Sequence, residues 1–460
     1  MMDKHSARRP NVIVLVADDH RYESIRAHGN PEVLTPTLDR LAERGVSYQS
    51  TNIIGGMDGA VCSPCRACLN TGSSIFGATV KQELGDTVEK MTLSPEKRTL
   101  GETFQQHGYY AYAVGKWHND TASFNRSFAG GNRIFFGGMS HHREVPVYAY
   151  DPAGTYSSSQ RTVESTFSTE LFTDEAESFI RRYDREDPFF LYVAYTSPHD
   201  PRTAPEPYAS HYEGDRVTVP GNFLPEHPFD NGEMHIRDEG LAGLPRTRDE
   251  VRRHIADYYA MITHMDAQMG RLMQALEETG RMDDTIVVYT SDHGLAVGQH
   301  GLMGKQNLYE HSIRIPWLMA GPGVPAKGPI RGQVYQMDIY PTLCELAGIP
   351  VPASVEGRSM AGLMRGEAGA EERNTVYALY KDTQRMVKDG RYKLIRYRKS
   401  GVTGEGTDMV QLFDLLEDPL ELRNLAQEPE MQQHIRRLDE AMQAWMRQVG
   451  DPFADSFAIS

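Results

Sequence analysis

The chain has 460 residues, 24% of them charged and 39% hydrophobic, which is an ordinary balance for a globular protein. Its formal net charge of −15 argues against general affinity for nucleic acid or for an anionic membrane. Four cysteines in so long a chain do not make a disulfide framework. No stretch approaches a membrane span, and the apolar run at 12–17 stops at Asp18, so it is typical of a buried strand rather than a signal peptide. We therefore expect a cytoplasmic protein without nucleic-acid or membrane partners.

Short apolar runs alternate with amphipathic helical segments along the first three quarters of the chain, which predicts an α/β fold. Thr35 as N-cap, Pro36 at the first position and Gly45 at the end predict a helix over 35–45. The segments 124–156 and 201–245 have no clear period and are predicted to be long loops at an active site. The other expected elements are strands at 11–17, 109–114, 188–195, 285–290, 316–320 and 334–337, and helices from 99 and over 173–183, 249–279 and 338–348.

A second region is expected in the last fifth of the chain, because residues 350–370 lose their periodicity. Beyond them, short runs alternate like antiparallel strands and a final amphipathic helix follows. These elements are strands at 375–379, 391–397 and 412–415 and a helix at 431–449. We therefore predict a catalytic domain over 1–370, with a large, mixed, mostly parallel sheet sandwiched by helices, and a smaller α+β subdomain with an antiparallel sheet over 371–460.

Four of the predicted strands are each followed by a cluster of polar residues. In an open α/β sheet, ligands bind at the carboxyl ends of the strands. The repeated placement of these clusters therefore predicts one shared site at a single edge of the sheet. The clusters are Asp18-Asp19, Lys116-x-His118, His199 and Asp292-His293.

The acidic members of these clusters suggest a metal site. Asp18, Asp19 and Asp292 supply three carboxylates, which would repel one another unless a divalent cation lay between them. Oxygen ligands favour Ca²⁺ or Mg²⁺, and the nitrogen of His293 would also suit Mn²⁺ or Zn²⁺. The alternative for an isolated Asp-Asp pair is a turn or a helix cap. A second cluster with the same chemistry, Ser291-Asp292-His293-Gly294, favours the metal.

The cationic and titratable members fit a tetrahedral anion. Such an anion carries several oxygens that need positively charged donors. Taken singly, a lysine is usually solvated and a histidine is usually structural. The set as a whole matches the demand, and consists of Arg66, Lys116, His118, His199 and Lys305.

A run of three cysteines at a spacing of three residues, Cys62, Cys65 and Cys68, admits several interpretations. Pro64 suits a first helical turn, so Cys62 would lie near a helix N-terminus, where an anionic or attacking atom is favoured. One interpretation is packing, since free cysteines are often buried. Another is an iron–sulfur site, for which the only other cysteine, Cys344, lies far away in the sequence.

The third interpretation is a family resemblance. Cys62-Ser63-Pro64-Cys65-Arg66, followed by Leu69-Asn70-Thr71-Gly72, resembles the signature of the type I sulfatases of the alkaline-phosphatase-like superfamily. In that family a formylglycine-generating enzyme oxidises the cysteine to formylglycine. Cys65 stands where the family usually has serine. Further matching segments are Asp18-Asp19, Gly115-Lys116-Trp117-His118, Pro198-His199, Ser291-Asp292-His293-Gly294, Gly304-Lys305, and, near the C-terminus, 391–396, 412–415 and 418–425.

The resemblance implies which residues bind the metal. Asp18, Asp19, Asp292 and His293, together with the modified Cys62, would hold one divalent cation. Calcium is the expected ion, with Mg²⁺ or Mn²⁺ as alternatives.

The resemblance also implies catalytic roles. One hydroxyl of the formylglycine hydrate would attack sulfur, and Arg66 and Lys116 would hold that hydrate. His199 and Lys305 would contact the sulfate and protonate the departing alcohol oxygen. His118 would take a proton from the second hydroxyl, so that the sulfate is expelled and the aldehyde returns.

The expected function is therefore hydrolysis of a sulfate monoester, of a sulfated small molecule or saccharide or of an aryl alcohol. One alternative is a phosphonate monoester hydrolase or phosphodiesterase with the same fold. Alternatives of other classes are a cysteine-rich iron–sulfur or redox protein and a binding protein in which Cys62 stays unmodified. Candidate selectivity residues, each also expected as an ordinary loop residue, are His20, Arg21, His141, His142, Arg143, Asp200, Arg202 and His311.

Overall fold

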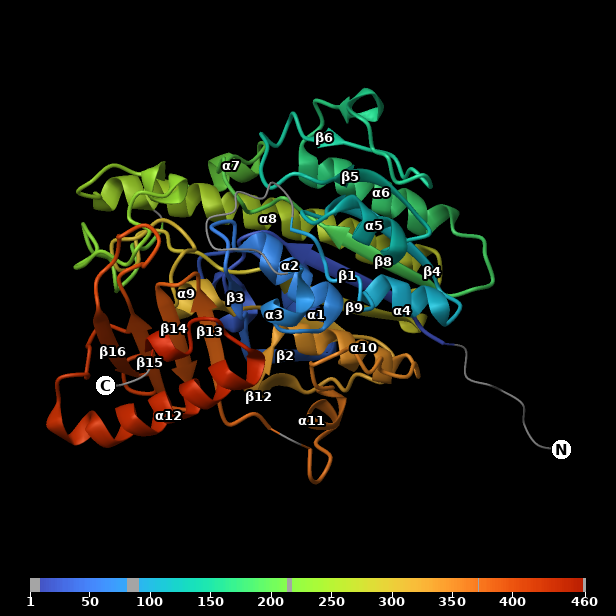
Figure 1. The fold of residues 1–460 in the computed structure, drawn as a ribbon. Helices are drawn as coiled ribbons and strands as arrows, with labels where there is room; N and C mark the ends of the chain where they lie inside the picture. Colours follow the sequence, from blue (N-terminus) through green and yellow to red (C-terminus); the bar gives the residue numbers. More distant parts are fainter. Residues whose placement is uncertain (1–8, 81–90, 213–216, 371, 458–460) are drawn as a thin grey trace.

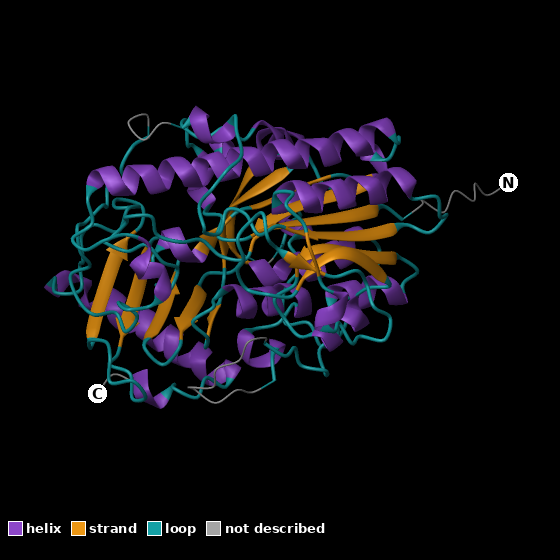
Figure 2. Ribbon diagram, turned by 90° about the horizontal axis from the view of Figure 1, so that it is seen from above, coloured by secondary structure: helices purple, strands orange, loops and turns teal. Residues whose placement is uncertain are grey.

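The computed structural model describes residues 9–80, 91–212, 217–370 and 372–457 (Figure 1). A large sheet with helices on both faces forms the greater part of the molecule, and a smaller sheet with one long helix lies beside it (Figure 2). The predicted fold class is confirmed. Among the described residues, no helix is both long enough and apolar enough to cross a membrane.

The large sheet runs in the order β10-β2-β11-β9-β1-β8-β4-β5, and β12 pairs with β2. Its centre is parallel: β1 pairs in parallel with β8 and β9, and β4 pairs in parallel with β8 and β5. β11 runs antiparallel to β9, so the sheet is mixed. The strands are β1 (Asn11–Ala17), β2 (Val46–Asn52), β4 (Tyr110–Lys116), β5 (Gly130–Phe135), β8 (Phe189–Ala194), β9 (Thr285–Ser291), β10 (Arg314–Ile315), β11 (Trp317–Ala320) and β12 (Gly328–Tyr335).

The two faces of this sheet each carry a hydrophobic core, because successive side chains of a strand point to opposite faces. Val12, Val14 and Val16 of β1 belong to one core, whereas Ile13 and Leu15 belong to the other. The first core is covered by α2 (Cys62–Thr71), α4 (Leu100–Gln106) and α10 (Ile339–Leu346). The second is covered by α1 (Pro36–Arg44), α6 (Ser168–Arg182) and α8 (Arg248–Glu278).

Helix α1 forms where the sequence predicts it, but its N-terminus is capped differently. The side chain of Thr35 makes no capping hydrogen bond. Instead, Asp266 of α8 accepts from the backbone N–H groups of Thr37 and Leu38, both at 2.9 Å. Burial raises the pKa of Asp266 to about 6. The predicted cap is therefore wrong, because a tertiary contact supplies the acceptor that local sequence was expected to give.

The smaller sheet runs in the order β16-β15-β14-β13-β3 and packs against α12 (Gln432–Val449). Its four long strands are antiparallel neighbours. Sequence analysis missed β14, which is buried along its whole length, and the short β3 comes from an early part of the chain. The strands are β3 (Gly55–Gly56), β13 (Val376–Tyr380), β14 (Gln384–Lys388), β15 (Tyr392–Tyr397) and β16 (Met409–Asp414).

The predicted loop over 124–156 is wrong in its first third. That part contains most of α5 (Thr121–Ser127) and then β5, the edge strand of the large sheet. Glycines and a register shift against β4 obscure the alternation by which a strand is recognised. In the described part of 201–245 the regular elements are two short helices, α7 (Tyr208–His211) and the 3-10 helix Arg237–Leu241, which fits the prediction of a long, mainly irregular segment. The remaining short elements are α3 (Ile75–Ala78), β6 (Pro146–Val147), β7 (Thr162–Val163), α9 (Glu310–Ile313) and α11 (Ala361–Arg365).

Candidate active site

The polar clusters that follow the parallel strands meet at one edge of the large sheet. Asp18 follows β1 and Asp292 follows β9, and these two strands pair in register up to Ala17 and Ser291. The backbone continues the pairing, since the Asp292 N–H donates to the Ala17 carbonyl at 3.2 Å. Lys116 ends β4, which is separated from β1 by β8. The topology thus brings together residues that are up to 274 positions apart.

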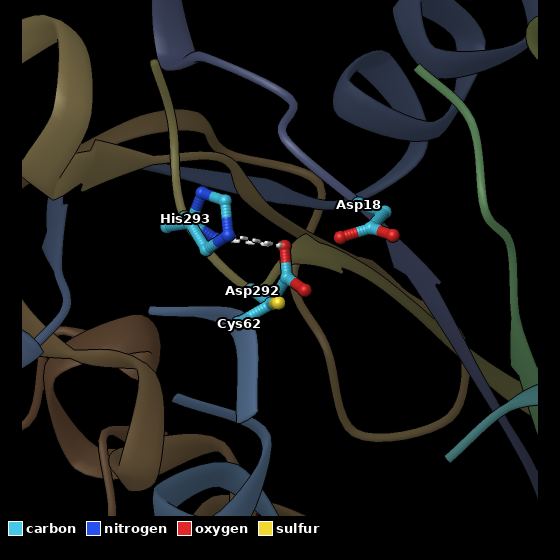
Figure 3. Close-up of side chains that lie close together, drawn as sticks. All are labelled: Asp18, Cys62, Asp292 and His293. Atoms are coloured by element: carbon cyan, nitrogen blue, oxygen red, sulfur yellow. Dashed lines mark hydrogen bonds and ion pairs between the residues drawn. The ribbon is translucent and has the colours of Figure 1, made fainter. Parts of the chain in front are cut away.

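Four side chains from three segments form a candidate metal centre (Figure 3). One ligand atom from each of Asp18, Cys62, Asp292 and His293 lies within 4.8 Å of the others, and all four residues are buried. Asp19 lies beside them, with its Oδ1 3.1 Å from His293 Nε2. All five residues predicted as metal ligands are therefore neighbours.

Every carboxylate of this centre already has a cationic partner. Lys116 Nζ lies 2.5 Å from Asp18 Oδ2, Arg66 Nε lies 2.9 Å from Asp292 Oδ2, and Lys305 Nζ lies 3.0 Å from Asp19 Oδ1. Neighbouring side chains therefore compensate part of the repulsion among the carboxylates.

These cations also govern the acidity of the centre. Burial raises the pKa of Asp292, but Arg66, His293 and Lys116 together outweigh it, so the pKa is lowered. The pKa of Asp19 is likewise lowered, because His199, Lys305 and His293 together outweigh burial. For His293, burial lowers the pKa but Asp292 raises it, to about 9. The carboxyl groups are thus held in the charged form that a cation requires.

The unpaired atoms provide a separate indication of a metal. Asp18 Oδ1 is buried and has no hydrogen-bond partner, and the buried His293 Nε2 lies near Asp19 and Asp292 but makes no hydrogen bond with them. Buried polar atoms are normally paired, so such atoms need an explanation. A carboxylate oxygen and an imidazole nitrogen are both ligands of divalent cations. The residues present therefore fit a bound divalent metal.

Residue 62 lies at the first position of α2 and is almost fully buried. Its Sγ lies 3.1 Å from His118 Nδ1. Ser63 donates to the His118 carbonyl at 2.9 Å, which fixes the two segments together. Burial raises the pKa of the Cys62 thiol, but Lys116 and Lys305 outweigh it, so the pKa is lowered. The site therefore favours a negatively charged atom at this position.

His118 is arranged to accept a proton. Burial and the nearby Lys116 hold its pKa well below the usual range, so the imidazole is neutral. Its backbone has a φ of 57°, in the left-handed region that few side chains adopt. A Cβ at Gly138 would lie 2.6 Å from its Nε2, so only glycine fits there. The ring is thus enclosed on the side away from residue 62.

A pocket of about 220 Å³ opens onto this group. Four of the predicted catalytic residues line it: Cys62, His118, His199 and Lys305. Lys305 is held by Asp19, and the Nδ1 of His199 lies 2.8 Å from the carbonyl of Asp200. The remaining lining residues are Gly59, Ala60, Gly138, Met139, Ile236, Arg237, Asp238 and Gln306.

Arg66 and Lys116 contact the carboxylates rather than the pocket. Arg66 also donates to the Lys116 carbonyl at 3.0 Å, and Lys116 Nζ donates to the Gly138 carbonyl at 2.6 Å. Arg66 and Lys116 thus join the candidate metal centre to the end of β4, which His118 follows. Their predicted direct role at the residue-62 hydrate stays a prediction.

The candidate selectivity residues lie outside this pocket. His20 and Arg21 are buried, hydrogen-bonded to Tyr289 and Ser24 respectively, and so have structural contacts. His142 supports the active-site loop, because its Nε2 lies 3.0 Å from the carbonyl of His199. The buried Asp200 pairs with Arg237. Of the others, His141 and Arg143 are exposed, and Arg202 and His311 are buried.

Sequence reasoning missed the pocket residues Met139, Ile236, Arg237 and Asp238. They lie in the two aperiodic segments that were predicted to flank an active site. No local spacing or motif singles them out there. Composition could indicate the segments, but only the fold selects the residues.

The three cysteines of the motif are separated by packing. Cys65 belongs to one hydrophobic core and Cys68 to another, and burial raises the pKa of both thiols. Among the described residues, no candidate metal group contains more than one cysteine. The iron–sulfur interpretation is therefore not supported.

Comparison with known proteins identifies the family. A family profile described as Sulfatase matches residues 10–349, and one described as N-sulphoglucosamine sulphohydrolase, C-terminal, matches residues 298–448. An N-acetylglucosamine-6-O-sulfatase of Bacteroides thetaiotaomicron is 25% identical, over 97% of this chain and 88% of its own length. Arylsulfatase K of Rattus norvegicus is 27% identical, over 92% of this chain and 76% of its own length.

Solved structures share the fold. One was determined in complex with its substrate D-glucosamine-2-N,6-O-disulfate and has a TM-score of 0.79 at 21% identity, covering 96% of this chain and 99% of the other. A phosphonate monoester hydrolase of Agrobacterium radiobacter has a TM-score of 0.72 at 20% identity, with 96% of each chain covered. With the first profile spanning most of the chain, this protein belongs to the sulfatase family of the alkaline-phosphatase-like superfamily and is a sulfuric ester hydrolase.

Proposed function

We propose that this enzyme removes sulfate from a sulfated saccharide, with formylglycine at position 62 as nucleophile and one divalent cation, Ca²⁺, beside it. The observation that carries the proposal is the pocket in which Cys62, His118, His199 and Lys305 face one space next to the carboxylate centre. In the structure, Cys62 Sγ marks the position that an oxygen of formylglycine would take.

The cation would be held by Asp18, Asp19, Asp292 and His293, together with residue 62. Bound there, it would stabilise negative charge on the sulfuryl oxygens. Four of the five ligands offer oxygen once residue 62 is oxidised, which supports a hard cation such as Ca²⁺. After oxidation by a formylglycine-generating enzyme, residue 62 would supply a hydrated aldehyde as the nucleophilic group.

The surrounding residues perform the proton transfers and hold the charge. His118, neutral and 3.1 Å from the residue-62 side chain, accepts a proton from it. Lys305 keeps its positive charge, because Asp19 raises its pKa despite burial, and so binds the sulfate oxygens. His199 lines the same pocket and protonates the leaving alcohol oxygen.

A saccharide substrate is supported by the relatives. One is named for N-acetylglucosamine 6-O-sulfate hydrolysis, and one structural neighbour binds a disulfated glucosamine. Other relatives are named arylsulfatases, so an aryl sulfate with a good leaving group should also be hydrolysed.

The test combines mass analysis with activity. The peptide containing residue 62 should show the lower mass of formylglycine relative to cysteine, and the enzyme should hydrolyse 4-nitrophenyl sulfate. Cys62→Ala should lose at least about 1,000-fold in kcat, since the nucleophile is absent. An unmodified peptide together with undiminished activity of Cys62→Ala would refute the proposed nucleophile.

A phosphonate monoester hydrolase shares the fold and is the alternative to exclude. The proposal expects a higher kcat/KM for 4-nitrophenyl sulfate than for 4-nitrophenyl phenylphosphonate. The reverse order would assign the phosphonate activity instead.

A further inference from the structure

Part of the pocket lining, here called the wall, consists of Met139, Ile236, Arg237 and Asp238, and Arg237 is its cationic side chain. It begins the short 3-10 helix Arg237–Leu241, and it lines the pocket together with Met139, Ile236 and Asp238. The Arg237 side chain is 45% exposed, whereas those of its partners Asp200 and Asp238 are only 7% and 10% exposed. The guanidinium is therefore the group that this wall presents to a ligand.

Two carboxylates hold this guanidinium in place. Arg237 Nη1 and Nη2 bind the two oxygens of Asp200 at 2.5 and 2.9 Å, and Nη2 also donates to Asp238 at 2.7 Å. Asp238 in turn accepts from Gln306 Nε2 at 2.9 Å. A bidentate pair fixes both position and orientation. Because the side chain is already ordered, binding a ligand to it costs little conformational entropy.

The charge of this wall argues against an anionic leaving group. One guanidinium faces two carboxylates, which leaves a net charge of −1 among Arg237, Asp200 and Asp238. A further carboxylate or sulfate would meet like charges, and such juxtaposition across an interface is costly. A hydroxyl group, by contrast, can donate to the Asp238 carboxylate and accept from the guanidinium.

The remaining surface of the wall fits a sugar ring. Met139 and Ile236 are apolar and lie in the same pocket as the polar Arg237 and Asp238. A pyranose ring likewise has an apolar C–H face and a rim of hydroxyl groups. At about 220 Å³, the pocket is smaller than the ~300–1,000 Å³ of sites that enclose drug-sized ligands, so it encloses the sulfate and one ring.

We propose that Arg237 binds a hydroxyl group of the leaving sugar, and that Asp200 and Asp238, which hold it, disfavour a ring that carries a carboxylate, so that this cluster selects an uncharged, hydroxyl-bearing sugar ring. This inference rests on the proposed sulfatase function. Asp200 also lies 3.4 Å from His199 Nδ1, so the same carboxylate links the sugar-binding arginine to the expected acid.

The test compares matched substrates. Methyl glucosides and methyl glucuronides that carry one sulfate at the same O2, O3 or O4 position differ only at C6, which is a hydroxymethyl group in the first and a carboxylate in the second. For the preferred position, the wild-type kcat/KM should be at least about tenfold higher for the glucoside, as expected for one desolvated like-charge contact. A preference for the glucuronide would overturn the proposal.

Arg237→Met keeps the aliphatic stem and removes the guanidinium. It should lower kcat/KM for the glucoside about 10- to 100-fold, mainly through KM, as loss of a charge-assisted hydrogen bond predicts. The loss on 4-nitrophenyl sulfate, which has no ring hydroxyls, should be at least about tenfold smaller. Equal losses on both substrates would show that Arg237 acts on the site as a whole, against the proposal.

Two further variants control for folding and for charge. Arg237→Lys keeps the charge but not the bidentate geometry, and should fall between wild type and Arg237→Met. Arg248→Met removes an exposed arginine from the start of α8, outside the pocket, and should leave both substrates unaffected. Absence of any sulfatase activity in the wild-type enzyme with formylglycine at position 62 would refute the proposed function itself and the subsite with it.

Discussion

Two fully buried arginines, each paired with an aspartate, distinguish the active site from the C-terminal sheet. Arg385 on β14 binds both oxygens of Asp451, at 2.6 and 3.0 Å, and also donates to the carbonyls of Lys381 and Gln384. Arg66 on α2 binds Asp292 through Nε and the Lys116 carbonyl through Nη1, but its Nη2 has no hydrogen-bond partner. Both side chains are fully buried, but only Arg385 has a hydrogen-bond partner for every nitrogen of its guanidinium.

In the active site, one atom of Arg66 and one atom of Asp18 lack hydrogen-bond partners. Arg66 Nη2 lies 3.8 Å from Asp18 Oδ1, beyond hydrogen-bonding distance, and both atoms are unpaired. An unpaired buried polar group costs about 1–3 kcal/mol or more, so a fold tolerates it only for another reason. The proposed cation would be that reason for Asp18 Oδ1. Buried charge alone therefore does not separate the two regions, whereas these two unpaired atoms beside the carboxylate centre do.

The largest expected effect is a loss of activity, from a change to the ion pair that Arg66 forms in the active site. Asp292→Asn weakens the metal centre and the partner of Arg66, and should lower kcat at least about 1,000-fold. The free energy of unfolding without metal, measured by urea denaturation in EDTA, should fall by less than in Asp451→Asn, because Asp18 remains 3.8 Å from Arg66 as a second anion. An active Asp292→Asn enzyme would contradict the assignment of the centre.

A change to the ion pair of Arg385 should instead lower the stability of the fold. Asp451→Asn leaves the Arg385 guanidinium buried without its anion, and should lower the free energy of unfolding by about 3–5 kcal/mol. The kcat of the folded enzyme should not change. Glu345→Gln is the matched surface control, since Glu345 and Arg365 are 41% and 37% exposed, and should cost no more than about 1 kcal/mol. Similar losses of unfolding free energy in Asp451→Asn and Glu345→Gln would show that burial does not determine how much an ion pair contributes to stability.

Metal removal should separate the two regions by thermal stability. If Ca²⁺ binds the folded centre, a concentration 100-fold above its Kd stabilises the fold by about 2.7 kcal/mol. Chelation should therefore lower the Tm of the wild type and of Asp451→Asn. It should not lower the Tm of Asp292→Asn, and an equal drop there would place the bound cation elsewhere.

The smallest effect concerns Asp266, which caps α1 far from either arginine. Its pKa is about 6 in the folded protein and 3.8 as the ordinary value, so the folded state binds more protons between these values. Its contribution to stability is fully present below pH 3.8, falls as pH rises through 6, and is constant above. Of about 3 kcal/mol in total, roughly 1 kcal/mol should be lost between pH 5 and 7.

The Asp266→Asn variant lacks this titration. The difference in unfolding free energy between wild type and variant, measured by urea denaturation across pH 5 to 7, should therefore fall as the pH rises. A difference independent of pH would show that Asp266 titrates with an ordinary pKa.

Much of the site could be predicted because its residues follow recognisable strands. Asp18 and Asp292 come directly after apolar runs, and parallel strands place such positions at one edge. Cys62 could be placed at a helix N-terminus from Pro64 alone. The resemblance to a family then assigned roles that spacing could not. Local pattern failed where glycines interrupt it, as in β5, and where a partner from another element replaces a local one, as Asp266 replaces Thr35.

By itself, the sequence determined the class of fold, the edge of the sheet that carries the site and the chemical types of the groups there. Hydrophobic periodicity and strand polarity are local properties, so a single chain displays them. Only the tertiary structure decided which charges pair with which, which buried atoms stay unpaired, and that Arg237 lines the same pocket as residue 62. Those contacts join segments far apart in the chain, and their geometry depends on packing rather than on any local pattern.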